Sequence, residues 1–191
     1  MSTDFTGFNE LEYKFKADDI KLQDFLALMS TLDVTKKKDV SSWDHYLTNS
    51  NEDEFLRYRE SNEPELTIKR KVNKNNNWDR IEVDLPLDSN RVNIATVSKF
   101  AELLGYTNRK SIYKTCCIYW MDYINFVYYI VYDVNMIEKG RFIEVEINKD
   151  KLDKEIVLVD THLKKGLEIL SKLGLTPQNR LKKSLYEIFV K

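Results

Sequence analysis

Polar and apolar residues alternate at every second position in many short stretches of this chain. Successive side chains of a β-strand point to opposite faces, so this period predicts strands with one ionic face and one apolar face. In residues 10–14, Glu10, Glu12 and Lys14 share one face, opposite Leu11. Two carboxylates on one strand repel each other unless a cation lies between them, so a divalent metal site is one interpretation and a solvated strand face is the other.

Turn residues separate several such strands. Asparagine-rich residues 73–77 predict the turn of one hairpin, and residues 121–125 predict the turn of a second, longer one. The predicted strands after the first are residues 42–47, 54–59, 65–72, 78–85, 112–120, 126–134 and 141–147.

Apolar residues recur at helical spacing in four segments. Asp18 and Asp19 are predicted to cap a helix that ends near residue 32, and Thr176 with Pro177 is predicted to open a last helix that ends near Val190. The other two helices are predicted at residues 94–104 and 151–173. The lysine run at residues 36–38 is interpreted as a solvated loop.

The ionic faces recur on five strands, which favours a particular architecture. An ordinary sheet turns its ionic face to water. A closed barrel would instead place the charges inside, where they must be wet and mutually neutralising, and its outer apolar face would need helices. We therefore predict an α+β fold, a single domain over residues 1–191, with a closed antiparallel barrel and helices packed outside.

The amino-acid composition limits the classes of protein to which this chain could belong. Hydrophobic residues make up 42% and charged residues 32%, as in globular proteins, and the net charge of −1 means that any anion site must come from local charge. Cys116 and Cys117 are adjacent and unsuited to a mutual disulfide, which favours a reducing compartment. Without an apolar run long enough for a signal peptide or a membrane span, we expect a cytoplasmic protein that does not enter a membrane.

With these residues in hand, the sequence resembles the CYTH superfamily, the triphosphate tunnel metalloenzymes. The motifs follow the family's order over nearly the whole chain, with Asp84 where the family usually has glutamate. The matching residues are Glu10-Leu11-Glu12-Tyr13-Lys14, Leu56-Arg57-Tyr58-Arg59, Thr67-Ile68-Lys69, Arg80-Ile81-Glu82-Val83-Asp84, Asp133, Gly140-Arg141-Phe142-Ile143-Glu144-Val145-Glu146, and the closing Arg180, Ser184, Leu185 and Tyr186.

This resemblance implies an eight-stranded antiparallel tunnel that binds a triphosphate group and Mg²⁺ or Mn²⁺. By motif position, the metal ligands would be Glu10, Glu12, Asp84, Glu144 and Glu146, and the phosphate-binding residues would be Lys14, Arg57, Arg59, Lys69 and Arg80. Glu82, Lys14 and Arg59 would be the catalytic residues, Glu82 by helping to hold metal or orient a water.

The chain departs from the family pattern before the last hairpin. The usual Lys-x-Arg pair is missing there, and Lys110 and Lys114, which share a strand face, are predicted to replace it as phosphate-binding residues. The hairpin at residues 116–132 is also unusually aromatic. These rings are interpreted as barrel exterior or a homodimer face, with a platform that stacks a base or an RNA end as the alternative.

The leading functional hypothesis is a metal-dependent triphosphatase. Its substrate would be inorganic triphosphate, thiamine triphosphate, a nucleotide or the 5′-triphosphate of RNA. A class IV-type adenylyl cyclase is one alternative. Another is a non-catalytic CYTH protein that binds nucleotide or RNA, including a tRNA-related role, because loss of one phosphate clamp costs catalysis before binding. The lysine-, asparagine- and tyrosine-rich composition would suit an AT-rich, viral genome. A solvated structural sheet is the last alternative.

Overall fold

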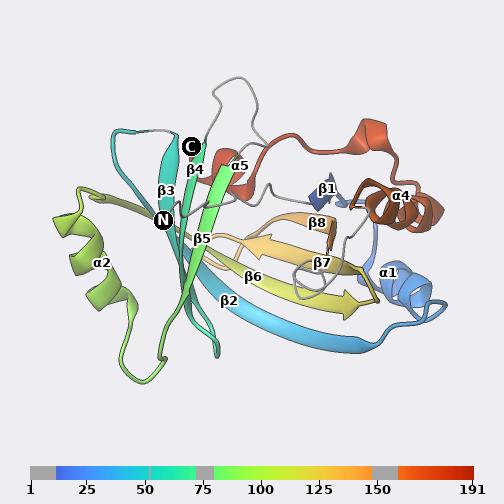
Figure 1. Ribbon diagram of the computed structural model, residues 1–191, viewed down its shortest axis with the longest axis horizontal. Coiled ribbons are helices and arrows are strands. Elements are labelled where there is room, and N and C mark those ends of the chain that lie inside the picture. The colour runs from blue at the N-terminus through green and yellow to red at the C-terminus, as the bar shows by residue number, and fades with distance from the viewer. Residues whose placement is uncertain (1–11, 52, 72–79, 148–158) are drawn as a thin grey trace, which may run out of the picture. The chain divides into compact units, whose positions relative to one another are not determined.

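A computed structural model of the protein describes residues 12–51, 53–71, 80–147 and 159–191. Eight strands and several short helices make up these ranges (Figure 1). The strands are β1 (Glu12–Lys16), β2 (Lys36–Thr48), β3 (Glu54–Glu60), β4 (Glu65–Lys71), β5 (Arg80–Pro86), β6 (Asn108–Trp120), β7 (Ile124–Tyr132) and β8 (Glu138–Ile147). The helices are α1 (Leu22–Met29), α2 (Ile94–Leu103), α4 (Val159–Leu170) and α5 (Leu185–Phe189), with 3-10 turns η1 (Ser171–Leu173) and η2 (Pro177–Asn179).

The strands form one sheet in the order β1-β8-β7-β6-β2-β3-β4-β5. β1 pairs antiparallel with β8, and the β2-β3, β3-β4, β4-β5 and β7-β8 pairs are antiparallel as well. The predicted antiparallel sheet of eight strands is confirmed. The predicted closure is wrong for the residues that the structure describes, because β1 and β5 are the two ends of this order.

The edge of β1 that does not face β8 pairs with a segment near Arg180 and not with another described strand of the sheet. Phe15 forms an antiparallel bridge with Arg180, and the Leu181 amide donates to the Lys14 carbonyl over 2.8 Å. A short segment from the C-terminal part of the chain therefore takes the edge that barrel closure would require.

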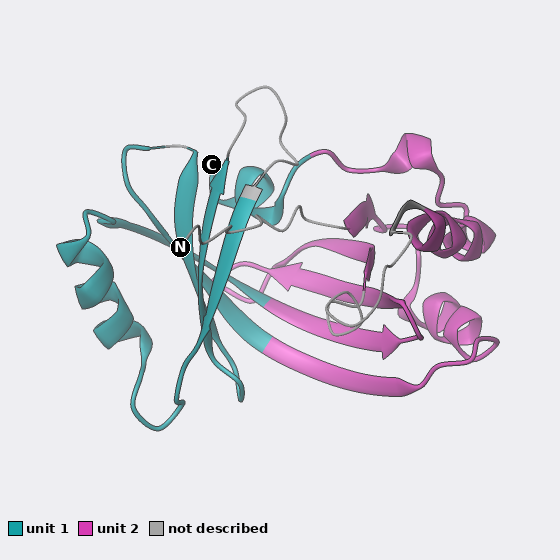
Figure 2. Ribbon diagram, viewed as in Figure 1, with its two compact units in different colours: residues 1–10, 42–113, 183–191 teal, residues 11–41, 114–182 magenta. Residues whose placement is uncertain are grey.

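The chain divides into two compact units (Figure 2): residues 1–10, 42–113 and 183–191 form unit 1, and residues 11–41 and 114–182 form unit 2. Each unit is described by itself below. The single domain expected from the sequence stays a prediction.

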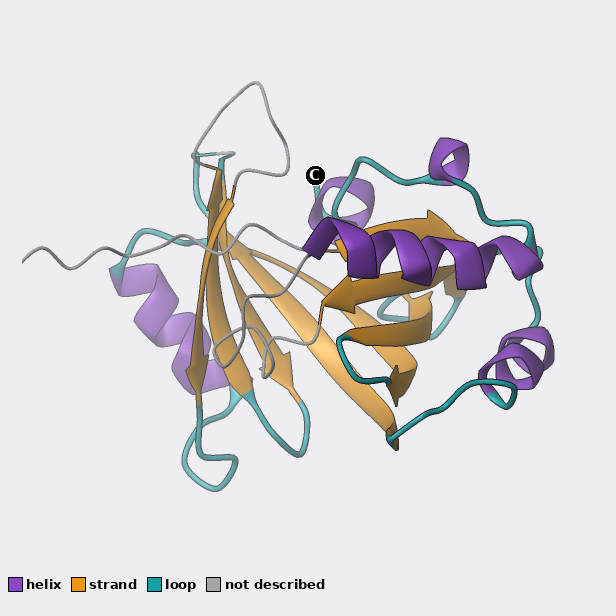
Figure 3. Cartoon of the chain, turned by 45° about the vertical axis from the view of Figure 1, so that its right-hand side comes forward, coloured by secondary structure: helices purple, strands orange, loops and turns teal. Residues whose placement is uncertain are grey.

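In unit 2, helices cover the apolar face of β1, β7 and β8. Phe15, Phe126 and Ile143 lie on this face, and all three are fully buried. α1 contributes Phe25 and α4 contributes Leu163 to the same core, and Figure 3 shows α4 lying across these strands. Glu12, Lys14, Glu144 and Glu146 alternate with these apolar residues, so strand geometry turns them to the opposite face.

Gly166 allows α4 to approach β8 closely. A Cβ atom added at this position would overlap the Val145 side chain, and it would lie 3.6 Å from the Cδ1 atom of Ile124. We expect Gly166→Ala to destabilise the protein by about 1–2 kcal/mol, because overpacking costs more than the helix propensity gained. Thermal unfolding checks this, with Lys165→Ala on the exposed side of α4 as control. An unchanged or higher melting temperature would contradict the close packing.

In unit 1, α2 packs on the apolar face of β2 and β3. Asn93 caps the helix, since its side chain accepts a hydrogen bond of 3.0 Å from the Thr96 amide. Val97 and Ala101 then face Leu56 and Tyr58 in one buried cluster. The predicted arrangement, with helices on the apolar faces, holds for each unit.

Three sequence-based predictions at element ends are wrong. The lysines at residues 36–38 begin β2 instead of forming a loop, and the Lys36 ammonium lies over the Trp120 ring, 5.0 Å from its centre. α1 begins after Lys21, because the Asp18 carboxylate accepts from the Arg141 amide instead of capping the helix. The expected last helix is interrupted at Arg180, where the chain becomes extended to pair with β1.

A buried carboxylate in unit 1 links stability to pH. Glu54 accepts hydrogen bonds from Tyr106 (2.8 Å), Arg70 (2.6 Å) and Asn49 (3.3 Å). Burial acts to raise the pKa of Glu54, but these three donors outweigh it and hold the pKa below its ordinary value of 4.5. A lowered pKa in the folded state stabilises the protein above pH 4.5, and this contribution disappears as the pH falls through the folded-state value.

We therefore expect the melting temperature to fall more steeply between pH 6 and pH 3 in the wild type than in Glu54→Gln. Circular dichroism melts at several pH values measure this slope. Glu102→Gln, on the exposed side of α2, should retain the wild-type slope. Equal slopes for wild type and Glu54→Gln would contradict the lowered pKa.

Among the described residues, no helix is both long and apolar enough to cross a membrane.

Candidate functional site

Three carboxylates meet on the polar face of unit 2. Glu12 lies opposite Glu146 in the β1-β8 register, and Glu144 is two positions from Glu146 on the same face of β8. Each of the three offers an oxygen within 4.8 Å of the others. We call Glu12, Glu144 and Glu146 the acidic cluster.

Lys14 neutralises part of this cluster. Its ammonium lies 2.9 Å from Glu12 Oε1 and 3.1 Å from Glu144 Oε1, and the side chain is buried. Buried charges are stable only when paired, so Lys14 and the two carboxylates stabilise one another. The ammonium lies between a carboxylate of β1 and one of β8, whereas the sequence predicted a cation between Glu10 and Glu12, of which Glu10 lies outside the described residues.

β7 adds two polar groups that the sequence did not single out. The Tyr129 hydroxyl donates a 2.6 Å hydrogen bond to Glu144 Oε1, and burial together with this carboxylate raises the pKa of Tyr129 well above its usual range. The Asn125 side-chain amide donates to Glu146 Oε1 over 3.3 Å, while its Oδ1 atom is buried and has no hydrogen-bond partner within the described part of the chain. The buried Lys114 ammonium lies 5.8 Å from the centre of the Tyr129 ring.

The donor set of the acidic cluster fits a hard divalent cation. Carboxylate oxygens are the ligands that Mg²⁺ and Mn²⁺ prefer. In ionised form, three carboxylates and the ammonium groups of Lys14 and Lys114 leave one net negative charge, so a cation would meet an attractive field. Glu12, Glu144 and Glu146 are the described residues that could hold it.

Arg180 positions the strand that carries Glu12 and Lys14. Its Nη2 atom donates to the Glu12 carbonyl over 3.1 Å, and its guanidinium stacks on the Tyr13 ring at 3.9 Å. The bridge from Arg180 to Phe15 adds a backbone contact. Arg180 therefore fixes β1 from its free edge, which agrees with its place in the closing motif.

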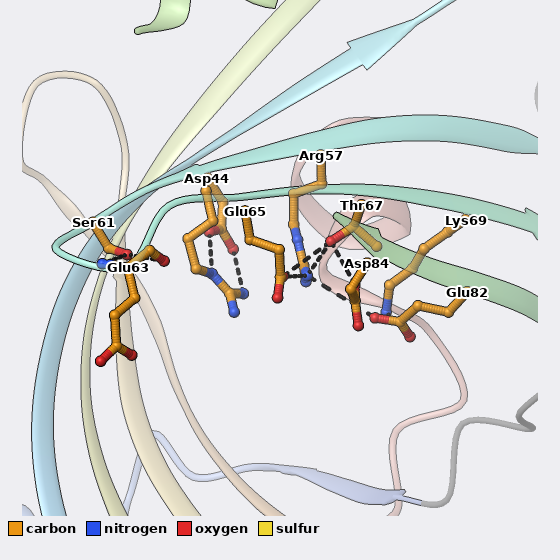
Figure 4. A network of polar contacts seen from close by, with 10 residues as sticks. Asp44, Arg57, Ser61, Glu63, Glu65, Thr67, Lys69, Glu82 and Asp84 are labelled. Carbon is orange, nitrogen blue, oxygen red and sulfur yellow. Dashed lines mark hydrogen bonds and ion pairs between the residues drawn. The ribbon is translucent and has the colours of Figure 1, made fainter. Parts of the chain in front are cut away.

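Unit 1 carries a second polar group of residues, on β3, β4 and β5 (Figure 4). Arg57 Nη2 donates to Glu65 Oε1 (3.0 Å) and to Thr67 Oγ1 (2.8 Å), and it lies 4.0 Å from Glu82 Oε1. Thr67 also donates to Asp84 Oδ1 over 2.8 Å. Lys69 pairs with Glu82 Oε2 at 2.9 Å. We call Arg57, Glu65, Thr67, Lys69, Glu82 and Asp84 the β3-β5 network.

Cross-strand register explains why these residues meet. Arg57 lies opposite Thr67, which lies opposite Asp84, and Lys69 lies opposite Glu82. Directly opposed side chains on one face of a sheet are close enough for hydrogen bonds. Two cations and three carboxylates make the network net negative in ionised form. A bare polyphosphate would meet repulsion here, and a divalent cation bound to the phosphate would reduce this repulsion.

Arg59 is also on β3, but its partner is Asp44 on β2 and not a residue of the β3-β5 network. Its Nε and Nη2 atoms donate to the two oxygens of Asp44, over 2.9 and 3.2 Å, in a bidentate pair. Asp44 is fully buried, whereas the Arg59 side chain is 29% exposed. Asp44 therefore holds the guanidinium in a fixed orientation with part of it accessible.

The remaining predicted site residues fall outside these two groups. Glu10 lies outside the described residues, and Arg80 is described only as the β5 partner of Lys71. Lys110 is exposed and donates to the Val190 carbonyl. Asp133, matched to a family motif, instead shapes the β7-β8 turn by accepting from the amides of residues 135 and 137.

Sequence reasoning missed Asn125, Tyr129, Glu65 and Asp44. Asn125 was placed in a turn, and Tyr129 lies in a continuous apolar run without alternation. Glu65 could have been found, because it alternates with Thr67 and Lys69 on one face.

Comparison with known proteins supports the fold. Neither the protein-family models nor the curated proteins include a match to this chain. Solved structures do match: a conserved hypothetical protein from Pyrococcus furiosus has 22% identity and a TM-score of 0.67, with 94% of this chain and 99% of that one covered. A protein from Pyrococcus horikoshii has 19% identity and a TM-score of 0.69, with 95% and 99% covered.

A candidate adenylate cyclase from Bacillus halodurans is also similar, with 14% identity, a TM-score of 0.59, and 95% of this chain and 97% of that one covered. Such identities bear on fold alone. They show that this chain shares its fold with these three proteins.

Proposed function

We propose that this protein is a divalent-metal-dependent triphosphatase. The observation that carries the proposal is the acidic cluster, in which three glutamates from β1 and β8 meet and two of them, Glu12 and Glu144, pair with the Lys14 ammonium. A sheet face that only met water would not need to bury a lysine between two carboxylates. Mg²⁺ or Mn²⁺ held by Glu12, Glu144 and Glu146 would neutralise charge on phosphoryl oxygens.

The chain's own residues would bind and orient the phosphates. Lys14, held at 2.9 Å from Glu12, would place an ammonium beside the bound cation as a point charge for a phosphoryl oxygen. Arg57 and Lys69 are proposed to bind phosphate oxygens in exchange for their present contacts with Glu65 and Glu82. Arg59, with its guanidinium fixed by Asp44, is proposed to act with them.

Glu82 and Asp84 have the remaining proposed roles in unit 1. Both are on β5, and both are hydrogen-bonded or ion-paired within the β3-β5 network. We propose that Glu82 orients the attacking water and that Asp84 holds metal that arrives with the substrate, since phosphates enter such sites as metal complexes.

Phosphate release tests the activity. Purified protein with Mg²⁺ or Mn²⁺ is assayed on tripolyphosphate, ATP, thiamine triphosphate and a 5′-triphosphorylated RNA. We expect release from at least one substrate and its loss on chelation. Cyclic AMP formed from ATP without phosphate release would identify the cyclase alternative instead.

A non-catalytic triphosphate or RNA binder is the second candidate. The placement of Lys110 favours it, because this lysine is exposed and engaged with the Val190 carbonyl. One predicted phosphate clamp is then weakened, which reduces catalysis before it abolishes binding. Tight binding of tripolyphosphate or RNA, with no release from any of the four substrates, would establish this candidate and exclude the triphosphatase.

A further inference from the structure

Asn125 is the least expected member of the polar face of unit 2. It lies directly opposite Glu146 in the β7-β8 register, and its side chain is on the same face as the acidic cluster. Only 7% of the residue is exposed. Its amide nitrogen contacts Glu146, so the amide group lies at the border of the cluster.

The oxygen of this amide is buried and has no hydrogen-bond partner among the residues that the structure describes. A buried polar atom without a partner costs about 1–3 kcal/mol, so native proteins rarely keep one without a reason. Apolar residues of similar size, such as leucine, would avoid this cost at the same position. The unpartnered oxygen therefore points to a ligand that is bound when the protein works.

We propose that Asn125 is a further ligand of the divalent cation, supplying its amide oxygen to the cation held by Glu12, Glu144 and Glu146. Amide oxygens are hard ligands of the kind that Mg²⁺ and Mn²⁺ accept. The inference rests on the proposed function to the extent that it needs the cluster to bind metal. It adds a neutral fourth group from β7 to carboxylates that come from β1 and β8.

A neutral ligand has a clear electrostatic purpose at this point. Three carboxylates with the ammonium groups of Lys14 and Lys114 sum to one net negative charge in ionised form, so one divalent cation would give the site one net positive charge. A fourth carboxylate would cancel that positive charge and add repulsion toward an anionic substrate. Asparagine provides an oxygen without that repulsion, so it suits a site that must hold both a metal and phosphate.

Isothermal titration with MnCl₂, without substrate, tests the assignment. We expect Asn125→Ala to weaken Mn²⁺ binding by about tenfold. Asn135→Ala is the matched control, since Asn135 is exposed in the turn of the same hairpin. Asn125→Ala binding within about twofold of the wild type would overturn the inference.

Asn125→Asp separates a ligand from a residue that only orients Glu146. A ligand role predicts tighter Mn²⁺ binding, because the oxygen is kept and a charge is added. A purely orienting role predicts weaker binding, because the donor to Glu146 is replaced by a repelling carboxylate, and this outcome would reject the proposal. The rise in melting temperature on adding Mn²⁺ should likewise be larger than in the wild type for a ligand role and smaller for an orienting role, and this measurement does not require activity.

The outcomes distinguish this inference from the proposed function. If the wild type does not bind Mn²⁺, both are wrong. If the wild type binds Mn²⁺ and Glu146→Gln does not, while Asn125→Ala binds normally, the metal site stands and only the role of Asn125 is rejected.

Discussion

Replacing Glu144 with glutamine is expected to lower the rate of metal-dependent phosphate release by roughly a thousandfold. Glutamine keeps the size of the side chain but removes the charge that faces Lys14 at 3.1 Å and accepts from Tyr129 at 2.6 Å. The cluster would then hold a cation with one carboxylate fewer. Initial rates at saturating Mg²⁺ measure the effect, and Mn²⁺ titration separates lost metal binding from lost catalysis. Glu12→Gln should behave in the same way.

Glu138→Gln provides the matched control for Glu144→Gln. Glu138 is also on β8, but it is exposed and pairs with Arg141 at 2.8 Å. Glu138→Gln should keep the rate of phosphate release within about twofold of the wild-type rate, since exposed ion pairs contribute little to stability. A folded Glu144→Gln variant with normal turnover would exclude the acidic cluster as the site of metal-dependent chemistry.

Arg57→Lys is expected to lower kcat/KM for the best triphosphate substrate by about a hundredfold. Lysine keeps the charge but not the planar donor fork, and the Arg57 fork now bonds Glu65 and Thr67 together. A change mainly in KM would indicate that Arg57 holds the substrate equally in ground and transition states, and a change in kcat would indicate transition-state contact. Steady-state kinetics with tripolyphosphate measure both.

Two control experiments are needed to interpret the kinetics of Arg57→Lys. Arg91→Lys is the control, because Arg91 is in the same unit with its side chain 83% exposed. A thermal melt shows whether the substitution has destabilised unit 1 through loss of the β3-β5 network. Unchanged kinetics in a stable Arg57→Lys variant would show that bidentate contact with phosphate is not needed.

The strand faces could be predicted from the sequence because alternation has only one geometric consequence. Glu12 and Lys14, or Thr67 and Lys69, are turned to one face by the two-residue period of a strand. The register that brings Glu12 opposite Glu146 could not be derived in this way, since pairing depends on strands far apart in sequence. The motif order of the CYTH resemblance supplied that information instead.

The errors arose where local pattern and tertiary pairing disagree. Residues 177–190 have a cap and helical spacing, yet Arg180 is extended because β1 offers it a free strand edge. β7 is apolar on both faces, so its pattern hides Asn125 and Tyr129 among core residues. A polar residue inside a continuous apolar run is therefore the clue that sequence analysis should have used.

The position of β1 also affects the order in which the protein can become active during synthesis. β1 is made first, yet its partners on β8 and at Arg180 come late, and the contact between Arg180 and Glu12 spans 168 positions. Closing such long loops is slow relative to local structure formation. Glu12 and Lys14 therefore reach Glu146 and Glu144 only after β8 has been synthesised, and the contact with Arg180 forms later still, so chains that end before β8 would lack the complete acidic cluster.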